Sequence, residues 1–295
     1  MIDKIKQLVE ASFDEIVEIR RYIHKNPELS FNEHNTSAYI KTILIGWGIS
    51  FTEDIADTGI VVLLEGNNPS SKTLALRADF DALPITEESE IDYCSVNKGV
   101  MHACGHDGHT VMLLGAARYL AETRNFAGTV ALIFQPAEED GGGANVMVQE
   151  GVLDRFGISE VYALHNAPGV PEGQFYTTPG PIMAAVDTFH IHVKGRGGHG
   201  AMPHETADPV IAACGIVQAI QTIVSRNHYA LDDLVISVTQ IHTGTAENII
   251  PETAYINGTV RTFAKEVQAL VQKRMAEIVQ GVASGYGVTA ELTYD

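Results

Sequence analysis

Apolar residues recur at helical spacing along the first 25 positions of the chain. They are Ile5, Leu8, Val9, Phe13, Ile16, Val17 and Ile19. This spacing predicts an amphipathic helix that ends at Pro27, because proline disrupts helical hydrogen bonding. A second predicted helix covers about residues 35–45 and stops at Gly46-Trp47-Gly48.

Short apolar runs predict the next elements of this first region. They predict strands at 59–64, 73–77, 129–134 and 160–164. Helical patterns lie between them, one directly after His109 and one at about 144–152. Continuous apolar strands that alternate with helices favour an α/β sheet covered on both faces.

The pattern changes after Gly180-Pro181. Residues 189–193 alternate between apolar and polar, as in a half-buried strand. The later pattern predicts, in order, a helix at 208–225, strands at 234–241 and 254–262, a helix at 267–283 and a strand at 288–293. This β-α-β-β-α-β order predicts a split-βαβ, ferredoxin-like α+β domain. We therefore expect two domains, 1–184 and 185–295.

Composition narrows the range of partners. The 295 residues contain 19 Lys and Arg against 37 Asp and Glu, a formal net charge of −18. An acidic chain without a basic run argues against nucleic acid or an anionic membrane surface as partner. No signal-peptide pattern opens the chain, and no apolar run was expected to span a membrane. Three cysteines make a disulfide framework unfavourable, so we expect a reduced, cytoplasmic protein.

Residues 101–110 concentrate three His, one Cys and one Asp. Cys104 and His106 are two positions apart, so in an extended or loop conformation both side chains could reach one metal ion. A helical pattern follows, which predicts a loop at a helix start. The alternative is a buried cysteine beside structural histidines.

Three predicted strands end in polar residues that suit chemistry. Asp79 and Asp81 follow the first, Glu138 and Glu139 the second, and His165 the third. Carboxylates at such ends face the ligand crevice of open α/β sheets. One of two adjacent carboxylates can bind a metal while its neighbour takes a proton from water. The alternatives are turn-forming aspartates and a solvated acidic loop.

Four motifs carry a resemblance to a known family. They are Arg-Ala-Asp-x-Asp-Ala-Leu-Pro at 77–84, His-Ala-Cys-Gly-His-Asp-Gly-His at 102–109, Gln-Pro-Ala-Glu-Glu at 135–139 and Gly-Gly-His-Gly-Ala-Met-Pro-His at 197–204. Together they resemble the M20 metallopeptidase superfamily, in its amidohydrolase branch of aminoacylase-like, hippurate and auxin-conjugate hydrolases. The resemblance implies a zinc-peptidase-like α/β catalytic domain with a mixed sheet. It also implies an inserted satellite domain used for dimerisation.

The resemblance further implies a site for two divalent metal ions. Its expected ligands are Cys104, His106, Glu139 and His165. Glu138 is the implied general base, and Asp81 the residue that orients the site from behind the ligands. Other branches carry a histidine ligand where this chain has Asp79. Mn²⁺ or Zn²⁺ is expected, with Co²⁺ or Ni²⁺ also open.

Three further residues follow from the resemblance in the second domain. His199 is expected to reach the active site of a partner subunit in a homodimer and to donate to the oxyanion. Asn248 and Arg261 match positions that bind the carboxylate end of the substrate, a task suited to arginine. The alternatives are a turn-forming asparagine and a surface arginine.

The expected function is that of a metal-dependent amidohydrolase that cleaves N-acyl-amino acids. A dipeptidase or carboxypeptidase of the same superfamily is an alternative. A non-catalytic metal or amino-acid binding protein is another. The pairing of Glu138 with Glu139 argues against pure binding, which needs no base.

The resemblance also implies a segment beyond residue 295. Relatives of this kind return to the catalytic domain there and add one more histidine ligand. All twelve His of this chain lie before position 243, and none matches that ligand. We therefore expect the 295 residues to be a fragment that holds one ion weakly and hydrolyses substrate poorly.

Overall fold

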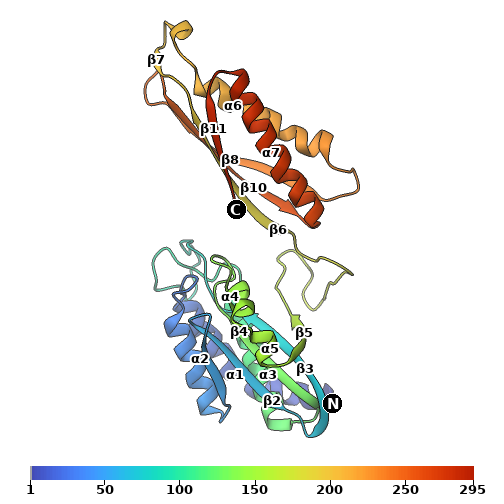
Figure 1. Ribbon diagram of the computed structural model, residues 1–295. Helices are drawn as coiled ribbons and strands as arrows, with labels where there is room; N and C mark the ends of the chain where they lie inside the picture. Colours follow the sequence, from blue (N-terminus) through green and yellow to red (C-terminus); the bar gives the residue numbers. More distant parts are fainter. Residues whose placement is uncertain (1) are drawn as a thin grey trace. The chain divides into compact units, whose positions relative to one another are not determined.

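The computed structural model describes residues 2–295, with side chains from residue 5 onward, and divides into two compact units (Figure 1). Unit 1 ends at Pro171, and unit 2 is Glu172–Asp295. Residues 172–184, which contain no helix or strand, group with unit 2. The domain boundary predicted after residue 184 coincides instead with the start of the first strand of unit 2.

Unit 1 is built on a five-stranded mixed sheet in the order β1-β2-β4-β3-β5. Its elements are α1 Ile2–Lys25, α2 His34–Gly46, β1 Phe51–Ile55, β2 Gly59–Glu65, β3 Asn68–Asp79, α3 His106–Thr123, β4 Ala127–Gln135, α4 Gly143–Gln149, α5 Val152–Arg155 and β5 Ile158–Ala163. The strands β4, β3 and β5 are parallel neighbours, and β1 and β2 run antiparallel. The predicted mixed α/β architecture is confirmed.

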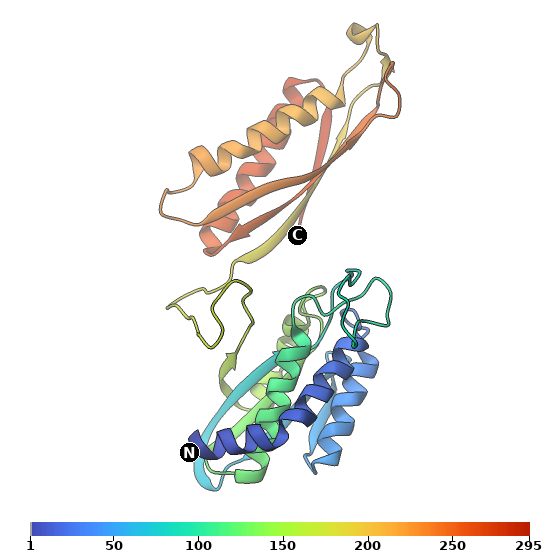
Figure 2. The ribbon, with the colours of Figure 1, turned by 180° about the vertical axis from the view of Figure 1, so that it is seen from behind.

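Helices cover both faces of this sheet, as the apolar strands predicted. Side chains alternate along β2, so Ile60 and Val62 pack with α1, α2 and α3, whereas Val61 packs with α4 and α5. Figure 1 shows α4 and α5 on the near face, and Figure 2 shows α1 and α3 on the other. β5 is an edge strand, and its Tyr162 side chain is exposed.

Three local predictions for unit 1 were wrong. Strand β1 was not predicted, because its sequence Phe-Thr-Glu-Asp-Ile at the sheet edge has little apolar periodicity. The single helix expected at 144–152 is two helices, since Gly151 between them has a φ of 77°. His106 and His109 lie inside the first turn of α3 rather than in a preceding loop.

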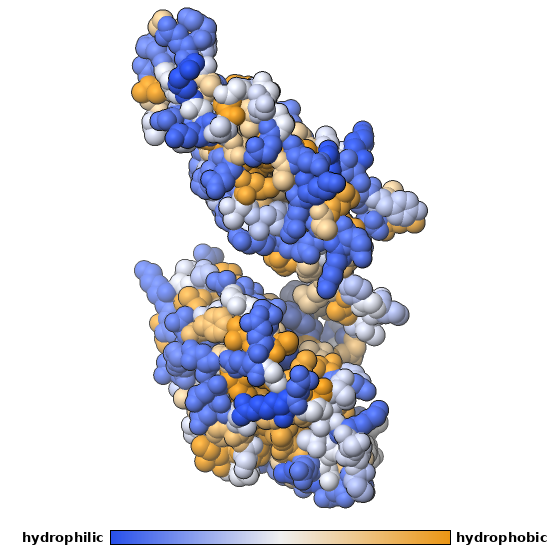
Figure 3. All heavy atoms as spheres, in the orientation of Figure 1, coloured by the Kyte–Doolittle hydropathy of each residue, from blue (hydrophilic) through white to orange (hydrophobic). Residues whose placement is uncertain are grey.

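Unit 2 is a four-stranded antiparallel sheet in the order β11-β6-β10-β8, with both long helices on one face. Its elements are β6 Ala185–Lys194, β7 Gly198–His199, η1 Pro203–Glu205, α6 Pro209–Thr222, η2 Ile223–Asn227, β8 Leu234–Thr243, β9 Ile249–Ile250, β10 Thr253–Thr262, α7 Lys265–Gly285 and β11 Thr289–Tyr294. Apart from the short β7–β9 pair, the elements follow in the β-α-β-β-α-β order. Hydrophilic residues predominate on the face of unit 2 visible in Figure 3.

The stretch Pro209–Asn227, formed by α6 and its π-helical continuation η2, is long and apolar enough to cross a membrane. The sequence predicted no stretch of this kind. Pro209–Asn227 also has the length and composition of a core helix. Ala212, Ile216 and Ile220 of this helix are buried against the sheet of unit 2.

Candidate active site

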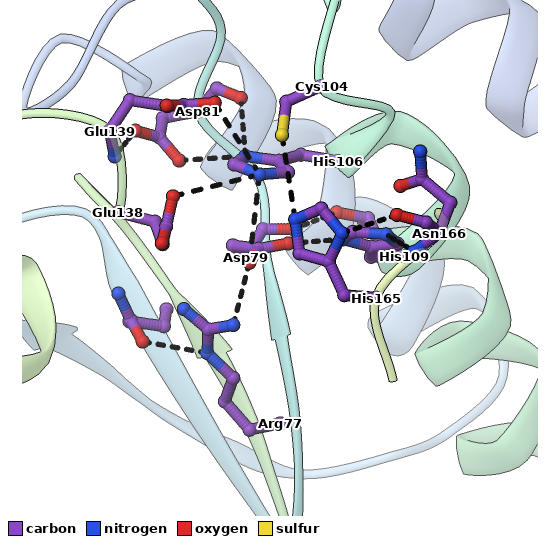
Figure 4. A network of polar contacts seen from close by, with 12 residues as sticks. Arg77, Asp79, Asp81, Cys104, His106, His109, Glu138, Glu139, His165 and Asn166 are labelled. Carbon is purple, nitrogen blue, oxygen red and sulfur yellow. Dashed lines mark hydrogen bonds and ion pairs between the residues drawn. The ribbon is translucent and has the colours of Figure 1, made fainter. Parts of the chain in front are cut away.

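The three parallel strands β4, β3 and β5 end at the same edge of the sheet of unit 1. In the parallel register, Asp79 of β3 lies opposite Gln135 of β4, and Arg77 of β3 lies opposite Ala163 of β5. Because parallel strands end on the same side, the residues that follow them meet there. Figure 4 shows these side chains gathered around the imidazole of His106.

His106 is the centre of this cluster. It is the first residue of α3, is fully buried, and follows Gly105, whose φ of 85° suits glycine. Its Nδ1 donates to the backbone oxygen of Asp81 at 3.0 Å and to the Asp81 carboxylate at 3.1 Å. Since both partners of Nδ1 are acceptors, Nδ1 carries the hydrogen in the neutral ring, and Nε2 then has the lone pair that a metal ion can take. Nε2 lies 3.7–3.9 Å from carboxylate oxygens of Asp79, Glu138 and Glu139.

The donor atoms around His106 suit divalent metal ions. Cys104, His106 and His165 form one group, and His106, Glu138 and Glu139 another, with donor atoms in each group within 4.8 Å of one another. Two of these donors, Nε2 of His106 and Oε1 of Glu139, are buried without a hydrogen-bond partner. Buried metal-ligating atoms without a hydrogen-bond partner are unfavourable unless a cation lies between them. The residues present therefore fit a metal centre, and the four predicted ligands are among the side chains of these two groups.

A third group of possible ligands is Asp79, His106 and His109. Two of its members, Asp79 and His109, bond to each other. His109 Nδ1 donates to Asp79 at 2.6 Å, and His109 Nε2 accepts the backbone N–H of Asn166 at 3.1 Å. Arg77 also donates to Asp79, at 2.6 Å. Both ring nitrogens of His109 are thus engaged, and the pair Asp79–His109 fixes the chain directly after His165.

Asp81 connects the ligand histidine to the acidic loop. Besides its bonds from His106, its Oδ2 accepts the backbone N–H of Glu139 at 2.9 Å and the hydroxyl of Ser30 at 2.8 Å. These contacts join the ring of His106 to the backbone of Glu139 and to Ser30 through one carboxylate. The contributions of Ser30 and His109 were missed, because their partners are far away in sequence.

The electrostatics of the cluster are strongly perturbed. Burial, then the neighbouring Glu139, raises the pKa of the Cys104 thiol to about 12. Burial, then the charge of Glu139, raises the pKa of Glu138. Although burial opposes it, the hydrogen bond from His109 and the charge of Arg77 lower the pKa of Asp79 to about 2. This concentration of carboxylates favours a bound cation.

The remaining predicted site residues lie in unit 2. His199 of β7 is exposed, and its Nδ1 accepts the backbone N–H of Ala201 at 3.1 Å. Asn248 is nearby, since its backbone oxygen accepts the N–H of Gly200 at 2.8 Å. Asn248 precedes the start of β10, whereas Arg261 lies near the end of this strand. At the usual rise per residue, Arg261 is roughly 25 Å along the strand from Thr253. The structure therefore brings His199 and Asn248 together but does not bring Arg261 to them.

Known proteins resemble this chain along most of its length. Residues 75–293 match the peptidase family M20/M25/M40. A thermostable carboxypeptidase 2 of Saccharolobus solfataricus is 44% identical over 100% of this chain and 75% of its own length. An N-acyl-L-amino acid amidohydrolase of Geobacillus stearothermophilus is 41% identical over 99% of this chain and 79% of its own length.

A solved structure supports the same relationship. It is a Bacillus subtilis protein described as a dinuclear metal binding peptidase from the M20 family, with 37% sequence identity and a TM-score of 0.80. The similarity covers 97% of this chain and 74% of the other.

Proposed function

Because the chain belongs to the peptidase family M20/M25/M40, whose members hydrolyse amide bonds, we propose that it is a metal-dependent amidohydrolase of N-acyl-amino acids. The observation that carries this proposal is the arrangement around His106. Four metal-competent side chains converge there, and the Glu138 carboxylate lies beside them.

In this proposal Cys104, His106, Glu139 and His165 hold two divalent cations, Mn²⁺ or Zn²⁺ with Co²⁺ or Ni²⁺ as alternatives. When bound, such cations supply Lewis acidity that polarises an amide carbonyl and acidifies water. Asp81 holds the His106 ring through Nδ1, so that the lone pair of Nε2 stays aimed into the site.

Glu138 is proposed as the general base. Its carboxylate takes a proton from the attacking water and returns it to the amide nitrogen as the amine leaves. Position supports this role, because the Glu138 side chain remains 37% exposed while that of Glu139 is 20% exposed. A base must meet solvent and substrate, whereas a ligand can be buried.

We further propose that residues 185–295 form a satellite domain, inserted in a catalytic domain and used for homodimerisation. His199 would then donate to the oxyanion in the partner subunit, and Asn248 and Arg261 would bind the substrate carboxylate. A cytoplasmic location remains a prediction. Analytical ultracentrifugation tests the dimer, since a monomer at micromolar concentration would contradict it.

A substrate panel tests the proposed activity. The purified protein would be loaded with Mn²⁺ or Zn²⁺ and offered N-acetyl-amino acids, N-benzoyl-amino acids and unblocked dipeptides. We expect slow release of free amino acid from the acylated substrates. Bound metal with no release from any substrate would favour a non-catalytic binding protein instead.

A carboxypeptidase is the second candidate, favoured by the 44% identity to a thermostable carboxypeptidase. The same panel separates the two activities when it includes N-blocked peptides. A carboxypeptidase removes the last residue of such peptides, whereas an aminoacylase-like enzyme prefers a single acylated residue.

A further inference from the structure

The acidic loop that carries Glu138 and Glu139 is held by the segment that precedes α2. We propose that Glu33, the residue before α2, is a positioning residue for this loop. The inference rests on the proposed roles of Glu138 and Glu139.

The contact point is Ala137, which precedes Glu138. Ala137 is buried and has a φ of 50°, in the left-handed region that non-glycine residues rarely adopt. Such a conformation is unfavourable and persists only where the surroundings impose it. The Glu33 carboxylate accepts the backbone N–H of Ala137 at 2.9 Å, across 104 positions of sequence.

Glu33 itself is committed to this contact. It is 0% exposed, and its second oxygen accepts the hydroxyl of Thr58 at 3.0 Å. Glu33 is also the N-cap residue of α2, yet its side chain makes no capping bond to that helix. An N-cap side chain ordinarily accepts a helix N–H, so here the carboxylate serves the loop instead of its own helix.

The loop is fixed on its other side as well. The oxygen of Ala137 accepts the N–H of Gly143 at 2.8 Å, and a Cβ on Gly143 would lie 2.0 Å from the oxygen of Pro136. Ser30, close to Glu33 in sequence, accepts the N–H of Asp140 at 3.2 Å. Together with the Asp81 bond to Glu139, these contacts determine where the base and its neighbouring ligand point.

A carboxylate suits this position because two donors face it, but an amide can replace it. In a Glu33→Gln variant the side-chain oxygen can accept from Ala137 while the side-chain amino group donates to Thr58, whose hydroxyl can also accept. Glu33→Ala removes both acceptors and leaves a buried N–H unpaired. The positioning role therefore predicts loss in one variant and rescue in the other.

The chain offers a matched control away from the site. Glu150 accepts the N–H of Ala56 at 2.8 Å, and Ala56 also has a φ of 50°. Glu150→Ala thus breaks the same type of bond, to the same type of residue, without touching the acidic loop. Glu150 is exposed whereas Glu33 is buried. An effect on kcat that came from losing the bond itself should appear in both alanine variants, whereas a loss of positioning should appear only in Glu33→Ala.

The test uses the metal-loaded protein and its variants at equal chain length. We expect Glu33→Ala to lower kcat about 100-fold with KM little changed, as for a displaced catalytic group. Glu33→Gln should stay within about fivefold of the unmodified protein, and Glu150→Ala should keep its kcat. Glu33→Asp, which keeps the charge but shortens the reach, should behave as Glu33→Ala and replaces it if that variant does not fold.

A second readout does not need turnover. Amide hydrogen exchange at Ala137, followed by NMR, should accelerate about tenfold or more in Glu33→Ala and not in Glu33→Gln. Unchanged kcat in Glu33→Ala, an equal fall in Glu150→Ala, or unchanged exchange at Ala137 would each overturn the positioning role. If the unmodified protein hydrolyses no substrate, the proposed function fails, while the exchange rates still decide whether Glu33 holds the loop.

Discussion

Replacement of Glu138 by glutamine tests whether this residue is the general base or a metal ligand. Glutamine has the same shape but cannot take a proton. The Glu138 carboxylate has no hydrogen bond within the described part of the chain, and its nearest ion-pair contact is His106 Nε2 at 3.9 Å. The substitution therefore removes a proton acceptor without breaking an observed bond.

The size of the effect follows from the proton that must be moved. General base catalysis contributes about 10²–10⁴-fold, which corresponds to about 3–5 kcal/mol of activation free energy. The free energy of unfolding should change by only about 0.5 kcal/mol, because the side chain is 37% exposed. Loss of the Glu138 charge also relieves repulsion with Glu139, whose charge raises the pKa of Glu138.

The assay combines steady-state kinetics on an N-acyl-amino acid with metal content after gel filtration. Glu138→Gln should lose kcat and keep its metal, whereas Glu139→Gln should lose both. Asp140→Asn is the matched control, because it removes the same charge from an exposed neighbour. Loss of metal from Glu138→Gln in proportion to its loss of activity would show that Glu138 is a ligand and refute the assignment.

Three further predictions concern metal binding, packing and pH. Cys104→Ala should lower metal occupancy, measured by titration against a chelator, because it deletes one donor of the cluster. Gly258→Ala should lower the free energy of unfolding, measured in urea, by about 1–3 kcal/mol, because its Cβ would lie 2.3 Å from a backbone oxygen. Gly281→Ala should raise this free energy by about 0.5–1 kcal/mol, because its Cβ would meet open space within a helix. The hydrogen bond to Asp107, opposed by burial, raises the pKa of His24 above 6.5. The pH-dependent part of the stabilisation lost in His24→Gln should therefore be fully present below pH 6.5 and disappear as pH rises through the folded-state pKa, measured by urea unfolding at a series of pH values.

The arrangement of metal-competent residues was predictable because it depends on strand ends. Apolar runs located β3, β4 and β5, and polar residues follow each run directly. Once parallel strands lie side by side, Asp79, Glu138 and His165 must meet at one edge. The resemblance of the motifs then separated ligands from base, which spacing alone left open.

The supporting contacts were not predictable, because each joins segments far apart in sequence. The bond from Ala137 to Glu33 spans 104 positions, and that between His24 and Asp107 spans 83. Glu33 lies two positions before the helix predicted at about 35–45, and no local pattern distinguishes it. Its function depends on a strained alanine in another loop, which no periodicity reveals.

Buried carboxylates link these supporting contacts to the chemistry of the site. Asp81 fixes His106, Asp79 fixes His109, and Glu33 fixes Ala137, and all three carboxylates are at most 1% exposed. Burial of a charged carboxylate is unfavourable, and in an acidic chain its neighbours add repulsion. Each is instead satisfied by hydrogen-bond donors, which are His109 and Arg77 for Asp79, His106 and Ser30 for Asp81, and Ala137 and Thr58 for Glu33. The negative groups that are most unfavourable to bury are thus those that hold the proposed ligands and the acidic loop in place.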